Sequence, residues 1–177
     1  SQDYAGLGGD FTYLKHDVSA AYYQPLTEEA EWLLVLSSNG GIVKGIGDDV
    51  PINARYFIGG QSFRGFDRSG IGPRDKATKD ALGGNIYYVG SAETTFPLGL
   101  PEDLGISGAL FTDVGSLWDI DGSKAGISDS SGVRASVGAG IGWKSPFGPI
   151  RIDFAVPVVK DGADEKKSFQ LNFGTRF

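Results

Sequence analysis

The sequence predicts an all-β fold, an antiparallel transmembrane β-barrel of about eight strands, on the basis of three observations. Apolar and polar residues alternate with a period of two along most of the chain, and helical periodicity is almost absent. The alternating segments are about 9–11 residues long, which is the length that a tilted strand needs to cross a bilayer. Short connections that contain proline alternate with long polar connections, as in outer-membrane barrels.

The expected strands follow this alternation in order along the chain. Between positions 133 and 143, the odd-numbered residues are apolar, and the even-numbered residues are Arg, Ser or Gly. Aromatic residues lie near the strand ends, where interfacial girdles are expected: Tyr22, Trp32, Phe96, Trp118, Trp143 and Phe177. We expect strands at residues 2–8, 11–24, 31–44, 84–97, 105–118, 132–145, 149–159 and 168–177.

The connections between these strands form two sets. Short connections are expected at about 24–27, 97–101 and 145–149, and long polar ones at about 45–83, 119–131 and 160–167. This layout puts the C-terminus on the side of the short turns, which is the periplasmic side of an outer-membrane barrel. A soluble β-sandwich also alternates with a period of two, with its apolar face pointing inward. Alternation by itself does not tell which face is buried, so that alternative stays open.

Composition excludes several classes of protein. The 177 residues include 28 glycines and no cysteine, and no apolar stretch is long enough for a transmembrane helix. A net charge of -6 without a cluster of Lys and Arg argues against binding to nucleic acid. The first residues already resemble the interior of a strand, so we expect the chain to be a piece of a longer protein.

Neither a catalytic site nor a metal site is predicted. The only histidine is His16, beside Asp17, and nothing in the sequence selects a nucleophilic serine to complete a triad. The segment 119–122 resembles the start of a calcium loop but lacks the remaining ligands. We therefore expect no enzyme activity, no cofactor and no metal.

The segment 45–83 is too long for a plain hairpin connection, and long loops of this kind are usually functional or disordered. It contains Phe63, Arg64, Gly65 and Phe66, and two large aromatic residues beside one arginine are unusual in a solvated loop. This pattern predicts either a loop that packs on itself or a loop that folds back and anchors Arg64 on a carboxylate. By parity along their strands, Glu93 and Asp113 both point into the lumen.

These residues resemble the lumen-loop motif of the BamA-like family of outer-membrane protein assembly factors. Gly59-Gly60 precedes the Arg-Gly-Phe core, and Gly72-Pro73 follows it. The resemblance implies that Arg64 lies inside the barrel and contacts Glu93 and Asp113 on the next two strands. It also implies that residues 1–177 are the C-terminal half of a sixteen-stranded barrel that periplasmic POTRA domains precede.

The function that the resemblance implies is assembly of other β-barrels in the bacterial outer membrane, as an insertase without a cofactor. The implied partners are membrane lipids, client β-barrel proteins and, for the full-length parent, the lipoproteins of the assembly complex. The terminal strand, with its insertion signal, would be formed by Phe169, Leu171, Phe173 and Phe177. A relative that translocates polypeptides and a passive barrel or porin remain as alternatives.

Strand edges without partners are not tolerated in lipid, so eight strands must close on themselves, pair with another copy or borrow a missing half. We expect a closed eight-stranded barrel in which the 45–83 loop lies at or above the mouth, partly displaced, because side chains fill so narrow a barrel. We also expect such a fragment to lack full insertase activity. Displacement of the loop would leave Arg64 exposed and far from Glu93 and Asp113.

Overall fold

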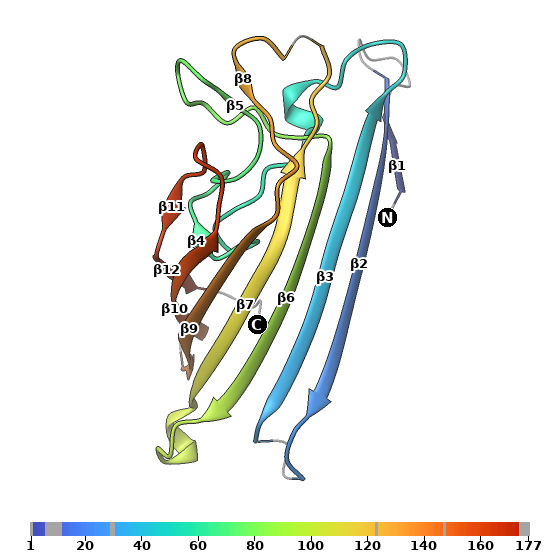
Figure 1. The fold of residues 1–177 in the computed structure, drawn as a ribbon. Helices are drawn as coiled ribbons and strands as arrows, with labels where there is room; N and C mark the ends of the chain where they lie inside the picture. The colour runs from blue at the N-terminus through green and yellow to red at the C-terminus, as the bar shows by residue number, and fades with distance from the viewer. Residues whose placement is uncertain (1, 6–11, 29–30, 123, 147, 174–177) are drawn as a thin grey trace.

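The computed structural model describes residues 2–5, 12–28, 31–122, 124–146 and 148–173. Its main element is an antiparallel sheet in the order β1-β2-β3-β6-β7-β9-β10-β12 (Figure 1). The bounds of its strands are β1 Gln2–Ala5, β2 Tyr13–Pro25, β3 Leu33–Gly45, β6 Ile86–Pro97, β7 Ile106–Trp118, β9 Arg134–Ser145, β10 Gly148–Val159 and β12 Phe169–Phe173. The predicted all-β antiparallel fold is confirmed, with strand bounds within two residues wherever both ends are described.

The long connections contain short elements that the sequence did not predict. The connection 46–85, called the Arg64 loop below, contains η1 (Ile52–Ala54), β4 (Gly65–Phe66) and β5 (Arg74–Asp75). The connection 119–133 contains β8 (Ile127–Ser128), and the connection 160–168 contains β11 (Lys166–Lys167). β11 pairs with β4, and β5 pairs with β8. Strands of two residues show no periodicity, which explains why they escape sequence analysis.

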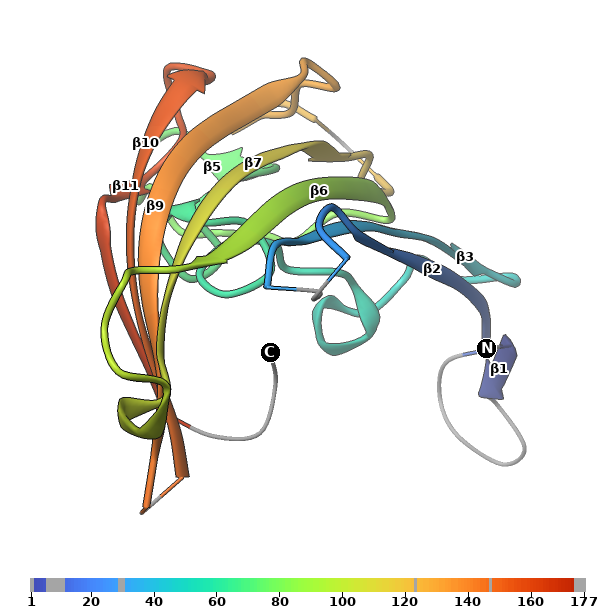
Figure 2. The ribbon, with the colours of Figure 1, turned by 90° about the horizontal axis from the view of Figure 1, so that it is seen from below.

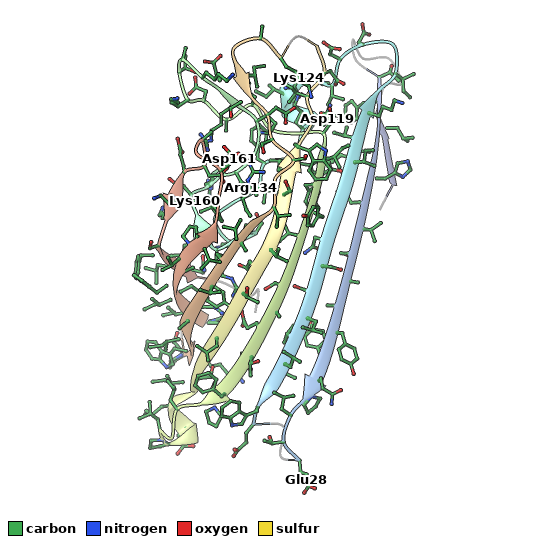
Figure 3. All side chains as sticks on the ribbon, in the orientation of Figure 1. Glu28, Asp119, Lys124, Arg134, Lys160 and Asp161 are labelled. Carbon is green, nitrogen blue, oxygen red and sulfur yellow. The ribbon has the colours of Figure 1, made fainter. Side chains whose placement is uncertain are left out.

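The two ends of the sheet differ in their connections, as predicted. Asp119 and Lys124 lie at the end that carries the long connections, and Glu28 lies at the opposite end (Figure 3). At the Glu28 end, the turn between β6 and β7 contains η2 (Glu102–Leu104). Only two residues, 146 and 147, separate β9 from β10 there.

The sheet curves as an arc, and the Arg64 loop lies on its inner side (Figure 2). β1 and β12 stand at the two ends of the strand order, and within the described part of the chain they do not pair with each other. The closed eight-stranded barrel that we expected is therefore not seen among these residues. The predicted segments 6–8, 11 and 174–177 lie outside the described residues.

The outer face of the sheet is apolar, and its inner face carries the buried polar groups. In β10, Phe154 is 58% exposed, whereas the adjacent Asp153 is 2% exposed. In β7, Leu110 and Val114 are exposed, whereas Asp113 is buried. A soluble β-sandwich would bury the apolar face instead, so this distribution rules out that alternative and fits strands that face lipid. No helix in the described part of the chain is long and apolar enough to cross a membrane.

The hydrophobic core lies between the Arg64 loop and the inner face of the sheet. The loop supplies most of the core, and β3, β6 and β7 supply the remainder. Its members are Val43, Val50, Ala54, Tyr56, Ile58, Phe63, Phe66, Ile71, Val89 and Leu117. The loop is therefore a packed structural element and not a solvated connection.

The first prediction concerns the apolar outer face. Replacing Phe154 by Lys in the middle of β10 is expected to destabilise the folded protein by about 2–4 kcal/mol, because a cation near the bilayer midplane loses hydration. The matched change Val158→Lys, on the same face near the end of the strand, is expected to cost about 0–1 kcal/mol. Urea unfolding in lipid vesicles measures both values, and equal losses would contradict a lipid-facing strand.

Candidate functional site

The tip of the Arg64 loop is shaped by glycines at positions that a side chain would block. Gly65 has φ +91°, and a Cβ there would lie 3.1 Å from Cβ of Ser136 on β9. Gly59 has φ +142°, and a Cβ there would lie 1.9 Å from the carbonyl oxygen of Asp67. Because glycine adopts positive φ without strain, the backbone can turn sharply and approach the wall of the sheet closely.

Phe63 and Phe66 fix the loop on either side of Arg64. Both rings are fully buried, with centroids 5.0 Å apart in an edge-to-face arrangement. Edge-to-face packing places the positive edge of one ring against the negative face of the other, which adds to the area that each ring buries. The two aromatic residues that seemed out of place in a solvated loop are thus core residues.

Arg64 lies almost fully buried against β6 and β7, at 8% exposure. Its Nε and Nη2 donate to the two carboxylate oxygens of Asp113 at 2.9 and 2.7 Å, which is a bidentate pair. Nη1 donates to Oε2 of Glu93, and Nη2 also donates to Oγ of Ser91 at 2.8 Å. The backbone N–H of Arg64 donates to Asp113 as well, at 3.0 Å. The structure therefore brings Arg64 together with both carboxylates that the sequence analysis selected.

These contacts overturn the expectation that the loop is partly displaced from the barrel. Arg64 is neither exposed nor distant from Glu93 and Asp113. The physical reason is the open arc of the sheet: the inner face leaves room for the loop that a closed eight-stranded barrel would lack.

The same cluster contains residues that the sequence analysis did not select. Arg151 on β10 donates to both oxygens of Glu93, at 2.6 and 2.9 Å, and its Nε donates to Asp153. The guanidinium carbon of Arg64 lies 3.5 Å from the ring centroid of Phe111, which is a cation–π contact. Parity could have found Arg151 and Asp153, because both occupy the polar face of their strand.

The cluster joins three strands to the loop through charge. Two arginines, Arg64 and Arg151, face three carboxylates, those of Asp113, Glu93 and Asp153. Glu93 receives hydrogen bonds from both arginines, so it links the loop to β10. Buried ion pairs recover in attraction roughly what desolvation costs, so the arrangement selects one position of the loop more than it adds stability.

Other residues singled out from the sequence have different surroundings. Phe169 and Leu171 lie exposed on the outer face of β12, and the backbone of Phe173 pairs with that of Ile150 on β10. The side chain of Phe173 and the whole of Phe177 lie outside the described residues. The backbone oxygen of His16 accepts a hydrogen bond from Tyr56 at 3.3 Å. The described segments contain no group of three or more His, Asp or Glu residues that could hold a metal ion.

The second prediction concerns the Arg64 cluster. Arg64→Ala would leave the buried carboxylate of Asp113 without its counter-charge, so we expect a loss of about 3–5 kcal/mol in the free energy of unfolding. We expect Arg64→Lys to free the loop partially, because one ammonium group cannot reproduce the bidentate pair. Urea titration and limited proteolysis within the loop measure the two effects.

Arg68→Ala is the matched control, since Arg68 is an exposed arginine of the same loop. Its loss is expected to stay within about 0.5 kcal/mol, as for most surface substitutions. Equal losses for Arg64→Ala and Arg68→Ala would show that the cluster does not hold the loop.

Comparison with known proteins places this geometry in a family. A model of the Omp85 superfamily domain matches residues 1–177. The outer membrane protein assembly factor BamA of Neorickettsia risticii (strain Illinois) is 37% identical over 174 residues, which cover 98% of this chain and 23% of that relative. The sorting and assembly machinery component 50 homolog of Mus musculus is 30% identical over 191 residues, with 100% of this chain and 40% of that relative covered.

A solved structure agrees with the sequence relatives. The crystal structure of BamA from Haemophilus ducreyi lacking POTRA domains 1-3 matches with a TM-score of 0.82 at 26% identity. The match covers 93% of this chain and 35% of that one, so the chain spans between about a quarter and two fifths of the length of these proteins. These relatives are named as assembly components, in agreement with the prediction that the chain is not an enzyme. The match across all of residues 1–177 shows that the chain belongs to the Omp85 superfamily, and its sheet corresponds to part of a BamA barrel.

Proposed function

We propose that this chain is the C-terminal half of the transmembrane barrel of an insertase that folds β-barrel proteins into the bacterial outer membrane. The observation that carries the proposal is the match of the whole chain to the Omp85 domain, together with 37% identity to a bacterial BamA. A role like that of the sorting and assembly machinery component 50 homolog is less favoured, because the relative from Mus musculus is 30% identical, against 37% for the bacterial BamA.

The edge of the sheet supports this function physically. β12 pairs with β10 and ends the strand order, so along its far side the described part of the sheet provides no partner strand. An edge strand of this kind presents a row of backbone donors and acceptors that can pair with an incoming extended segment. Phe169 and Leu171 keep the outer face of this edge apolar, as lipid contact requires. Such an edge would template the strand of a client protein without any chemical reaction.

The Arg64 loop supports the same proposal from the inner side of the sheet. It packs into the arc and is held by charge against β6, β7 and, through Glu93, β10. A passive porin needs a water-filled lumen, whereas this loop fills part of the inner face with an apolar core. The porin alternative predicts a steady ion conductance and no requirement for Arg64.

The partners that follow from the proposal are of three kinds. Membrane lipids would contact the apolar outer face, client β-barrel proteins would pair at the edge, and assembly-complex lipoproteins would bind the full-length parent. A polypeptide-translocating relative of the same superfamily is the second candidate, and the number and type of periplasmic domains would separate it from an assembly factor.

The third prediction tests assembly directly. Residues 1–177 replace the matching segment of the Neorickettsia risticii BamA, and the chimera is reconstituted in liposomes with a urea-unfolded β-barrel client. We expect the client to become protease-resistant faster than in empty liposomes. We expect Arg64→Lys to slow this step and Arg68→Lys to leave it unchanged, because only Arg64 belongs to the buried cluster.

One outcome would contradict the proposed function, and another would contradict the expectation that the fragment lacks full activity. A chimera that conducts ions steadily but does not accelerate client insertion would identify a passive barrel. Full acceleration by residues 1–177 alone would contradict our expectation that the activity needs the remainder of a longer barrel.

A further inference from the structure

The position of the edge strand β12 depends on the Arg64 loop as well as on β10. β12 pairs with β10 over the segment Ile150–Phe154. From its inner face, buried Gln170 donates through Nε2 to the carbonyl oxygen of Phe66 at 3.3 Å. Gln61 at the loop tip donates to Oδ1 of Asn172 at 2.5 Å. A strand with one backbone partner opens locally at low cost, so these two inner hydrogen bonds add to the pairing with β10 in holding β12.

The connection 160–168, which leads from β10 into β12, is itself paired with the Arg64 loop. β11 of the connection forms an antiparallel pair with β4 of the loop. Beside this pair, the backbone oxygen of Glu165 accepts from Asp67 at 3.0 Å, and the backbone N–H of Glu165 donates to Gly70 at 2.8 Å. Buried Arg74 adds an ion pair to Glu165 with a separation of 3.0 Å. Loop and connection are thus joined as one unit.

A further buried arginine, Arg134, connects the loop and the connection to strand β9 of the sheet. Nε and Nη2 of Arg134 on β9 donate to the two carboxylate oxygens of Asp164 at 3.2 and 3.3 Å, and the two side chains are 2% and 1% exposed. Nη1 of Arg134 donates to the carbonyl oxygen of Gly132 at 2.6 Å. Asp164 also accepts from the backbone of Asp161 at 2.6 Å. Arg134 lies at the same end of the sheet as Asp161 of the connection (Figure 3).

These contacts form a continuous path from the Arg64 cluster to the edge strand. The path begins at the Arg64 cluster and passes through the β4–β11 pair into the connection 160–168. Within the connection, Asp164 forms an ion pair with Arg134 of β9. The connection then leads into β12, where Gln170 donates a hydrogen bond to Phe66 of the loop. Bidentate arginine–carboxylate pairs have narrow geometric tolerance, so the pair of Arg134 with Asp164 limits how far the connection can move.

We infer that Arg134, Asp164 and Gln170 are positioning residues that couple the seating of the Arg64 loop to the pairing of the edge strand β12. Release of the loop then releases β12, and a seated loop keeps β12 on β10. The coupling goes beyond the proposed function, although it would give that function a means of exposing or closing the edge that a client strand would use.

Hydrogen–deuterium exchange of the protein in lipid nanodiscs tests this coupling without any client. Arg64→Lys is expected to raise amide exchange in β12 by about tenfold, the change that corresponds to losing one charge-assisted hydrogen bond. Asp164→Asn is expected to raise β12 exchange similarly, because an amide N–H would face the donors of Arg134 and Asp161. Exchange in residues 20–23 of β2, which lie beyond the contacts of Lys15 and His16 with the loop, is expected to stay unchanged for both variants.

The double variant separates coupling from simple destabilisation. If β12 has already been released by Asp164→Asn, then adding Arg64→Lys should raise its exchange by much less than tenfold. Independent effects would multiply instead, and that result would overturn the inference. Gln170→Leu, which removes the donor to Phe66 and keeps an unbranched Cβ, provides the same comparison if Asp164→Asn fails to fold.

The matched control is Lys124→Gln, which removes an ion pair of 2.8 Å with Asp129 in the connection 119–133. We expect it to leave β12 exchange unchanged. An equal rise for Lys124→Gln and Asp164→Asn would also overturn the inference. The two experiments can fail separately. If the variants show coupled exchange in β12 but the chimera does not accelerate client insertion, the proposed function is wrong and the coupling is still supported.

Discussion

The bidentate pair between Arg64 and Asp113 is the interaction on which the inner half of the structure depends. Both groups are almost fully buried, so removing either one would leave the other as a buried charge that has lost its bidentate partner. The pair therefore allows one position of the loop tip, and the aromatic rings of Phe63 and Phe66 fill the space on either side of it. The β4–β11 pair and the hydrogen bonds from the loop to Gln170 and Asn172 of β12 lie next to that position.

The two faces of the sheet differ in polarity because they contact different surroundings. The outer face is apolar because lipid cannot hydrogen-bond a polar side chain, whereas the inner face holds charge because other protein charges lie opposite. Glu93 illustrates the second case, since it serves two arginines from two separate parts of the chain. A loop held by charge on the inner face leaves the outer face free for lipid.

The charged cluster around Arg64 lies close to the sheet edge that the proposed function uses. β10 carries Arg151 of the cluster and is also the backbone partner of β12. The connection between these two strands is held by Asp164 and by β11. The edge at which a client strand would pair is thus joined to the loop by the Asp164–Arg134 ion pair and the β4–β11 backbone pair.

The sequence by itself determined the strand number, the two kinds of connection and the side of the strand that Glu93 and Asp113 face. The contact of Arg64 with these carboxylates was implied only by the family resemblance, and the expected displacement of the loop was wrong. Period-two alternation and parity are local properties, and they fix which side of a strand a residue faces. Only the tertiary structure decided that the loop sits in the arc, that Arg151 shares Glu93 and that Arg134 holds Asp164. These contacts join residues 30 to 58 positions apart, and the curvature of the sheet, which no local pattern encodes, brings them together.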